Sequence, residues 1–363
     1  MSNGQTPTTN ESIATPTLIT NLDATRWNDI VLQHDGHLLQ SWAWGELKGQ
    51  FGWQPRHIAV TNGRQTAAAQ LLIRRFFGVA AAYVPRGPVW SGDEQLDRYM
   101  IETLRRTAQR ERAAFLRIEP NALEHHSMAS RIALLLHTNR FRIAEPLQPR
   151  SSIHLDLTPG PDKLFAAFTK GHRADVRRAE RNGVQVRVGS SKNDLLTFYS
   201  IMETTGARQQ FGIHAQAYYA AALQHFGDAA RMLIAEHEGE AVAAFLIFGR
   251  GREAQYMYSG SNEQGLKLGA NHLLQWHALQ WAHERGCTIY DFWGIPDAFG
   301  QMAHATGQQL ALLEAAAKTH PLYGVYRFKK GWGGDVVRYL PAYDQVYFAP
   351  AYWVWQRRRG GDG

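Results

Sequence analysis

Two of the four stretches whose residues could do chemistry place a cation where an anion can reach it. In 40–48 (QSWAWGELK), helical spacing puts Trp44 and Lys48 on one face, which suits a nucleotide sugar or a phosphate. In 85–88 (PRGP), two prolines hold Arg86 in a rigid loop, which suits bidentate recognition of an anion. The alternatives are a core tryptophan beside a lysine whose head reaches solvent, and a plain turn.

The other two stretches place charges beside aromatic rings. In 290–295 (YDFWGI), Asp291 lies near the C-terminal end of an apolar strand, where ligands bind in α/β sheets; the alternative is a buried carboxylate that caps a loop. In 326–334 (YRFKKGWGG), cations alternate with aromatic residues, and glycines come after them. Such a segment suits RNA or a charged acyl group, and a solvated basic loop is the alternative.

Several common catalytic and metal sites are excluded. The sequence has no HExxH, GxxxxGK[ST] or GxSxG pattern and no GxGxxG after a strand. Its single cysteine, Cys287, allows neither an intrachain disulfide nor a cysteine-based zinc site. The pairs His125–His126 and His34–His37 fit flexible loops better than a metal cluster, so we expect no metal.

The charge is basic and clustered. The 363 residues carry 39 Lys and Arg against 32 Asp and Glu, a formal charge of +7, and 31 of the cations are arginines. Such clusters suit phosphate-bearing partners such as RNA, nucleotides or anionic lipid, with solvated helix faces as the alternative. The thiol count favours a reducing compartment, and we find neither a signal peptide nor an apolar run of about 18 residues. These features predict a cytoplasmic protein.

The elements that must position these stretches predict an α/β fold that is used twice. Strands at 57–60, 66–76 and 79–84, a helix to about residue 113 and a strand at 115–118 follow one another, with a hairpin turn at Gly63. The same order returns in the second half with a hairpin turn at Gly239, 176 positions later. This near-constant offset indicates an internal duplication of about 175 residues.

Between the two copies, further segments have readable patterns. Residues 153–157 alternate as a half-buried strand does, and a basic helix is expected over about 162–181. A proline-marked stretch places a domain boundary near residue 149. We therefore divide the chain into a disordered tail (1–20), a first domain (21–149) and a second domain (150–339).

Taken together and in this order, the four stretches resemble the FemABX family of non-ribosomal peptidyl transferases. The resemblance runs from about residue 39 to 347 and includes 115–120 (FLRIEP), 202–208 (METTGAR) and 258–261 (YSGS). It implies two tandem GNAT-like acyltransferase domains, with the segment 340–363 returning to complete the first. No stretch of heptads is long enough for the coiled-coil arm of some members, so this chain looks like the compact form.

The resemblance implies an aminoacyltransferase that moves an amino acid from aminoacyl-tRNA to the side-chain amine of a peptidoglycan stem peptide. The acceptor is UDP-MurNAc-pentapeptide or its lipid-linked form, and the amino acid stays open among Gly, Ala and Ser. No cofactor is implied, because aminoacyl-tRNA is a co-substrate. Tyr352, Trp353 and Trp355 beside three terminal arginines look like an interfacial anchor, which favours peripheral contact with the inner face of the membrane.

Site residues follow from the resemblance position by position. Lys48, Arg208 and Tyr258 are similar to the family's ligands for the nucleotide and phosphates of the precursor, with Arg86 beside them. Phe328 and Lys329 match the pair near the tRNA acceptor end and the reacting ester.

Two positions depart from the family's motifs. Glu119 stands where the family has Asp, as a candidate proton acceptor whose role the longer side chain puts in doubt. Trp293 replaces a commoner glycine, which would narrow a pocket.

We expect a neutral amine to attack the ester carbonyl while Lys329 stabilises the oxyanion, with much of the catalysis coming from positioning. A GNAT acetyltransferase that uses an acyl-CoA is the nearest alternative, but its pyrophosphate turn ([QR]-x-x-G-x-[GA]) would need Gln or Arg at Leu266. Aminoacyl transfer to a protein N-terminus or a lipid headgroup, and an RNA-binding protein without catalysis, are the others.

Overall fold

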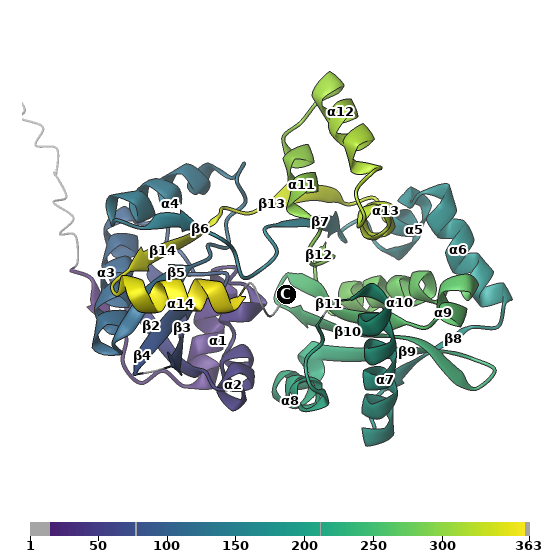
Figure 1. Cartoon of the computed structure of the whole chain (residues 1–363), viewed down its shortest axis with the longest axis horizontal. Helices are drawn as coiled ribbons and strands as arrows, with labels where there is room; N and C mark the ends of the chain where they lie inside the picture. Colours follow the sequence, from purple (N-terminus) through teal and green to yellow (C-terminus); the bar gives the residue numbers. More distant parts are fainter. Residues whose placement is uncertain (1–14, 77, 211, 360–363) are drawn as a thin grey trace, which may run out of the picture.

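A computed structural model describes residues 15–76, 78–210 and 212–359, without the side chains of residues 358 and 359. Two seven-stranded sheets stand side by side, each with helices against its faces (Figure 1). The longest helix among the described residues, α7, has 18 residues.

The first sheet has the strand order β1-β2-β3-β4-β5-β14-β6. Helices α1 (Ala24–Gln33), α2 (Trp42–Gln50), α3 (Glu94–Arg110), α4 (Ser127–Thr138) and α14 (Ala349–Arg359) belong to this half. Its strands are β1 (Thr17–Leu18), β2 (Gln54–Thr61), β3 (Thr66–Phe76), β4 (Val79–Val84), β5 (Ala113–Ile118), β6 (Arg142–Ala144) and β14 (Ala342–Val346).

The second sheet has the order β13-β7-β12-β11-β10-β9-β8. Its strands are β7 (Ser151–Asp156), β8 (Gln185–Gly189), β9 (Ala230–His237), β10 (Glu240–Arg250), β11 (Glu253–Ser261), β12 (Ile289–Asp291) and β13 (Asp335–Arg338). Its helices are α5 (Pro161–Ala167), α6 (Lys170–Arg181), α7 (Lys192–Gln209), α8 (Gln216–Phe226), α9 (Glu263–Leu268), α10 (Ala270–Glu284), α11 (Asp297–Gly300), α12 (Gly307–Ala317) and α13 (Tyr323–Lys330).

The two sheets repeat one topology, as the duplication predicted. In each half, three antiparallel strands (β2–β4 and β9–β11) lead through a helical crossover to a strand that pairs in parallel with the third. The predicted hairpin turns lie between β2 and β3 and between β9 and β10, where Gly63 and Gly239 both have a φ of +84°. That left-handed conformation favours glycine, which explains why the turn signals were reliable.

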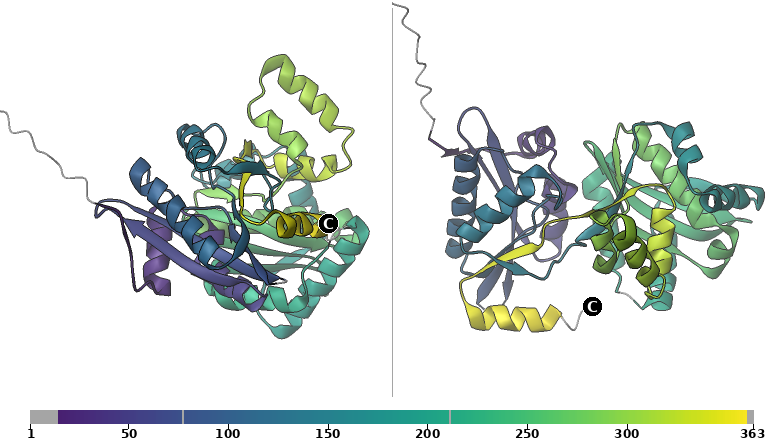
Figure 2. Two further views of the ribbon diagram at one scale, coloured as in Figure 1. Left: turned by 60° about the vertical axis from the view of Figure 1, so that its left-hand side comes forward. Right: turned by 90° about the horizontal axis from the view of Figure 1, so that it is seen from above.

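The halves also exchange a strand. β7, which follows β6 in the chain, pairs with β12 in the second sheet, while β14, which follows β13, pairs with β5 in the first. The two connecting segments lie side by side, because Tyr339 N donates to Arg150 O at 2.8 Å and Arg150 Nε donates back to Tyr339 O at 3.0 Å. Figure 2 shows this double crossing between the halves.

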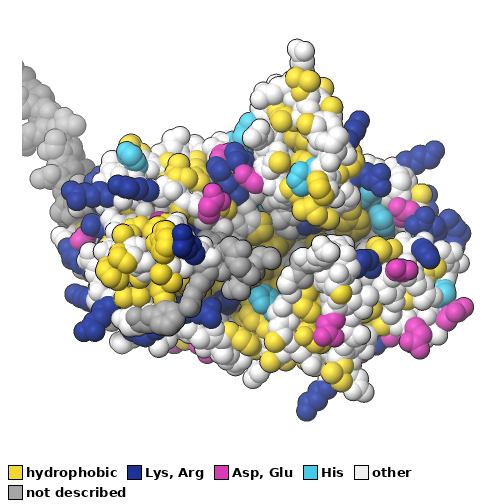
Figure 3. Space-filling model, viewed as in Figure 1, with side chains coloured by type: hydrophobic (Ala, Val, Ile, Leu, Met, Phe, Trp, Pro, Cys, Tyr) yellow, Lys and Arg dark blue, Asp and Glu magenta, His cyan; other side chains and the backbone are white. Residues whose placement is uncertain are grey.

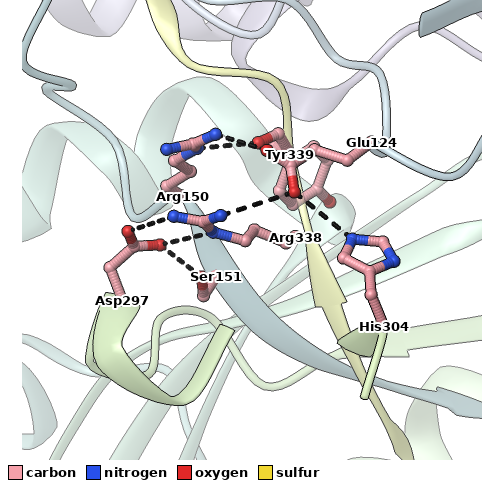
Figure 4. A network of polar contacts seen from close by, with 7 residues as sticks. All are labelled: Glu124, Arg150, Ser151, Asp297, His304, Arg338 and Tyr339. Carbon is pink, nitrogen blue, oxygen red and sulfur yellow. Dashed lines mark hydrogen bonds and ion pairs between the residues drawn. The ribbon is translucent and has the colours of Figure 1, made fainter. Parts of the chain in front are cut away.

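A polar network holds the crossing together (Figure 4). Asp297 accepts from Ser151 Oγ at 2.6 Å and pairs with Arg338 at 2.8 Å. Glu124 pairs with both Arg150 and Arg338. These groups come from both connecting segments and from both halves. The network therefore adds hydrogen bonds and ion pairs to the two covalent connections between the halves.

Some predicted elements differ from the structure. Residues 1–14 of the predicted tail lie outside the described residues, and the prediction was wrong for Thr17–Leu18, which form the edge strand β1 and pair with β2. The predicted helix over 162–181 is two helices, because Phe168 is extended and Thr169 caps α6 by accepting from His172 N. The long helix that the repeated order predicts in the second half is instead two helices, α9 and α10, separated by Gly269 at a φ of +82°.

An apolar core is shared between the halves and underlies the site. It joins Leu72 and Tyr83 of the first sheet to Leu246 and Phe248 of the second. Helices α2, α7 and α8 contribute to the same cluster. The far face of the second sheet packs on a separate core with α5, α6 and α10. The second sheet therefore has one face toward the first half and another toward α6, α10 and α13.

Candidate active site

Lys48 lies where the two halves meet. Its ammonium is 5.4 Å from the ring centres of both Trp44, one turn earlier on α2, and Tyr218 on α8. Tyr218 stacks on His214 at 4.0 Å, and its ring is 6.4 Å from that of Tyr258 on β11. The predicted pair of Trp44 and Lys48 is therefore part of an aromatic cluster that spans both halves.

The electrostatic setting of Lys48 suits an anion. The pKa of Lys48 is lowered from its usual 10.5 to about 8, mainly by burial and to a lesser extent by the positive charge of Arg74. Two cations that destabilise each other gain from a shared negative ligand, because the ligand removes their repulsion. Trp44 itself is buried, so it supports Lys48 and is not a free stacking surface.

Arg208 contacts the C-terminal end of β11. It lies in the last turn of α7, and its Nη1 donates to Ser261 O at 2.8 Å. Tyr258 lies three residues earlier on the same strand and packs against the shared core. The structure thus brings Lys48, Arg208 and Tyr258 to one face of the second sheet.

Strands β11 and β12 diverge just where chemistry was predicted. They pair only from Glu253 to Gln255 on β11 and from Ile289 to Asp291 on β12. Beyond this point Trp293 has a φ of +50° and Gly294 a φ of +69°, so the chain turns toward β7. A gap therefore opens between residues 293–294 and the C-terminal half of β11.

Lys329 fills this gap from α13. Its Nζ donates to Trp293 O and Gly294 O, each at 2.5 Å, and lies 5.8 Å from the ring of Tyr256 on β11. Burial lowers the pKa of Lys329 to about 8, although the carboxylate of Asp291 acts in the opposite direction. Two of the three ammonium hydrogens bind the carbonyls, which leaves one for another acceptor.

Asp291 is a buried anchor behind Lys329. It accepts hydrogen bonds from Ser152 Oγ and, at 2.8 Å, from Trp293 N, and lies 3.6 Å from His154. Burial raises its pKa, but His154 and these donors lower it more, so the carboxylate stays ionised. The loop-capping alternative from the sequence therefore describes its contacts, and its charge also favours the ammonium of Lys329.

Arg86 and Glu119 bind residues 145–150, the linker that leads from β6 in the first half to β7 in the second. Arg86 donates to Pro149 O, and its guanidinium lies 3.7 Å over the ring of Tyr339, but its Nε has no partner. It is 5.9 Å from the ring of Trp293. Arg86 therefore borders the gap rather than the Lys48 cluster.

Glu119 holds the linker through its carboxylate, which accepts from Tyr83 Oη at 2.8 Å and from the backbone of Leu147 and Gln148. Burial raises its pKa against these donors. None of its polar contacts within the described residues leads to Lys329.

Phe328 lies on the opposite face of the second sheet. It lines a cavity of about 710 Å³ between α6, α10, α12 and α13, together with His172, His272, Arg327 and Lys330. His172 bonds Phe328 O through Nε2 at 2.7 Å, and the rings of His272 and Phe328 are 5.0 Å apart. Aromatic and cationic side chains of the basic segment therefore line this cavity.

Comparisons with known proteins identify the family of this chain. The model of the FemAB family matches residues 22–238 and 234–356. The chain belongs to the FemAB family. Lipid II:glycine glycyltransferase of Staphylococcus aureus (strain USA300) is 24% identical over 400 residues, which cover 88% of this chain and 90% of that protein.

Solved structures establish the fold. The crystal structure of FemX has a TM-score of 0.79 at 20% identity and covers 93% of this chain and 99% of its own. A tandem GNAT protein from the clavulanic acid biosynthesis pathway has a TM-score of 0.55 at 11% identity, with 92% and 98% covered. This FemAB-family chain is thus a tandem GNAT-like α/β protein, as its motifs implied.

The turns where a GNAT unit cradles pyrophosphate are not free in this FemAB-family chain. In the first half, Asp97 lies in the first turn of α3, accepts from Ser91 N at 2.8 Å and pairs with Arg131. In the second half, Gly269 at the start of α10 lies against α6, since a Cβ there would be 2.9 Å from Asp175 O. A diphosphate would have to displace these contacts, which argues against the acyl-CoA alternative.

Sequence reasoning missed Tyr218 and His214, which enclose Lys48. The tandem tyrosines at 218–219 were the available signal. Within the described residues, no group of three or more His, Cys, Asp or Glu side chains could hold a metal ion. None of the helices in the same residues is long and apolar enough to cross a bilayer.

Proposed function

We propose that this protein transfers an amino acid from aminoacyl-tRNA to the side-chain amine of a peptidoglycan precursor, as in the building of interpeptide bridges. Membership of the FemAB family and the relative named lipid II:glycine glycyltransferase support the reaction class. The observation that carries the proposal is the position of Lys329, a buried ammonium in the gap between β11 and β12.

Each substrate has its own face of the second sheet. Lys48, Arg208 and Tyr258 suit the diphosphate and nucleotide of UDP-MurNAc-pentapeptide or the diphosphate of its lipid-linked form, because that face offers two cations and an aromatic ring. The cavity at Phe328 suits the acceptor end of the tRNA, because it offers rings for stacking and Arg327 and Lys330 for phosphates. The two substrates then meet in the gap at Lys329.

The reaction needs one bond to form and one to break. The neutral amine of the stem peptide attacks the ester carbonyl, the carbonyl oxygen becomes an oxyanion, and the ester bond to the tRNA ribose breaks. The proton lost by the amine is finally carried by the ribose hydroxyl that leaves. Lys329 donates its third hydrogen to the oxyanion, where a fixed donor lowers the barrier. Glu119 acts at a distance by holding the linker.

A direct assay tests the function. The purified protein is mixed with tRNA charged with glycine, alanine or serine and with either the soluble or the lipid-linked precursor, and the mass of the precursor is followed. A gain of one amino acid residue with intact tRNA, lost when the tRNA is deacylated, is the expected result. If no charged tRNA supports transfer to either acceptor, the proposal is wrong. Because charged tRNA is cytoplasmic, we place the reaction there.

A further inference from the structure

The C-terminal helix α14 has one face on the first sheet and one away from it. Trp355 packs on Phe115 and Phe76, with ring centres 5.5 and 5.6 Å apart. Tyr352 packs on Phe115 at 5.2 Å and donates to Asp344 Oδ2 at 2.7 Å. Of the aromatics that looked like an anchor in the sequence, these two instead hold α14 to the sheet.

The outward face of α14 is apolar and exposed. Pro350, Trp353 and Val354 follow helical spacing on this face, and Trp353 is 52% exposed. Phe348, just before the helix, is 50% exposed. Figure 3 shows apolar side chains gathered over α14, on the side of the molecule that faces the viewer. A fixed helix thus presents a continuous apolar strip to its surroundings.

The charge around this strip is positive. The guanidinium of Arg357 lies 3.5 Å from the centre of the Trp353 ring, and the sequence continues with two more arginines. Between residues 345 and 359 the sequence has no acidic residue, and Asp344, the last acidic residue before them, is buried in a pair with Arg117. The strip is therefore complementary to a negatively charged surface.

We propose that the outward face of α14 docks on an anionic lipid bilayer. Tryptophan and arginine together favour the boundary between headgroups and acyl chains, where the ring is half apolar and the guanidinium meets phosphate. RNA would satisfy the arginines but would leave Val354 and Phe348 against water, and a second copy of this basic strip would repel it. The bilayer is the partner that uses both features.

The docking face and the site of Lys48 lie on the same side of the first sheet. Trp355 packs against the shared core that contains Trp44 and Tyr258. A bilayer bound to α14 would therefore lie on the same side of the first sheet as Lys48, where we propose that the diphosphate of a lipid-linked precursor binds. This consequence rests on the proposed function, but the docking itself does not.

Vesicle sedimentation of the full chain tests the docking without tRNA or precursor. We expect binding to vesicles with 30% phosphatidylglycerol, weakened by salt, and little binding to pure phosphatidylcholine, with the acidic fraction chosen as roughly that of an anionic leaflet. Arg357→Gln should lower the partition coefficient about fivefold, as each basic residue near such a surface contributes about that factor. Trp353→Ala should also lower binding to the anionic vesicles.

Matched changes on other exposed surfaces serve as controls. Arg98→Gln on α3 and Leu312→Ala on α12 remove one exposed cation and one exposed apolar side chain, and should leave vesicle binding unchanged. Circular dichroism checks that all four variants fold. The proposal is overturned if Arg357→Gln and Trp353→Ala bind vesicles as the wild type does.

Two other outcomes also overturn the docking. In the first, Trp353→Ala dissolves a dimer seen by ultracentrifugation. In the second, Arg357→Gln weakens binding of tRNA while the wild type ignores vesicles. Transfer to the soluble precursor should persist in Trp353→Ala, so failed docking and failed transfer remain distinguishable.

Discussion

Replacing Lys329 by methionine separates its chemical role from its structural one. Methionine keeps the length of the side chain but removes the ammonium that donates to Trp293 O and Gly294 O. If the third hydrogen of Lys329 stabilises the oxyanion, Lys329→Met should reduce kcat roughly 100- to 1,000-fold, the usual effect of losing one such donor. Binding of the precursor at Lys48 should be nearly unchanged.

The same substitution should leave the fold almost as stable as before. Lys329 is 8% exposed, and its pKa falls from 10.5 to about 8 on folding. At about 1.4 kcal/mol per pKa unit, keeping it charged at neutral pH destabilises the fold by roughly 3 kcal/mol, which methionine removes. Leaving two carbonyls without a donor costs about 1 to 3 kcal/mol each. These opposing effects nearly cancel.

The assay follows kcat, KM for each substrate and thermal unfolding on one preparation. Lys267→Met on α9, an exposed lysine, is the control and should match the wild type in all of them. Stability should also respond to pH with a definite sign. Because the folded pKa lies below the unfolded one, the wild type should gain stability over Lys329→Met as pH rises from 8 toward 10.5. A kcat close to wild type in Lys329→Met would refute the chemical role.

Three further predictions concern charged residues away from the gap. Affinity for the precursor should fall up to about tenfold between pH 7 and 9, measured by calorimetry, because Lys48 loses its charge above a pKa of about 8; Lys48→Arg should flatten this dependence. Glu119→Gln should lower the melting temperature, since an amide group would face the backbone donors of the linker, while kcat stays close to wild type; a large loss of kcat at unchanged melting temperature would make Glu119 a base. Asp344→Ala should destabilise the fold by about 3 to 5 kcal/mol in denaturant unfolding, because it leaves the buried Arg117 unpaired, and Asp344→Leu combined with Arg117→Met should recover most of that loss.

Local patterns predicted the local structure of this chain well. The hairpin turns at Gly63 and Gly239 and the duplication follow from backbone preferences and spacing, which do not depend on distant contacts. The return of β14 to the first sheet could not be predicted in the same way, because the pattern of residues 342–346 (AYDQV) does not specify which sheet accepts them; only the family resemblance implied it.

The role of each charged residue depended on contacts far apart in the sequence. Glu119 follows the end of β5 and was a candidate proton acceptor. Its carboxylate instead accepts hydrogen bonds from the backbone of the linker, which lies 28 residues later in the sequence. The resemblance placed Lys329 near the reacting ester, while its two carbonyl partners lie 35 and 36 residues earlier in the chain. Such partners become visible only when the fold is known.

The duplication has left two copies that differ at the same place. In the first copy, β4 and β5 stay paired to their ends at Val84 and Ile118. Glu119, just after β5, then accepts hydrogen bonds from the backbone of the linker. In the second copy, β12 leaves β11 after three residues.

The parting of β11 and β12 exposes backbone groups that a sheet would otherwise satisfy. The segment after β12 is held toward β7 by Phe292 N to Ile153 O at 3.0 Å, and Lys329 supplies the donors that β11 no longer gives to residues 293 and 294. A hydrophobic side chain there would fill the gap but leave the carbonyls unpaired, and a re-formed β ladder would close it. Although burying its charge destabilises the fold, Lys329 thus keeps the gap between β11 and β12 open from one face of the second sheet to the other. Its third ammonium hydrogen remains free in that gap.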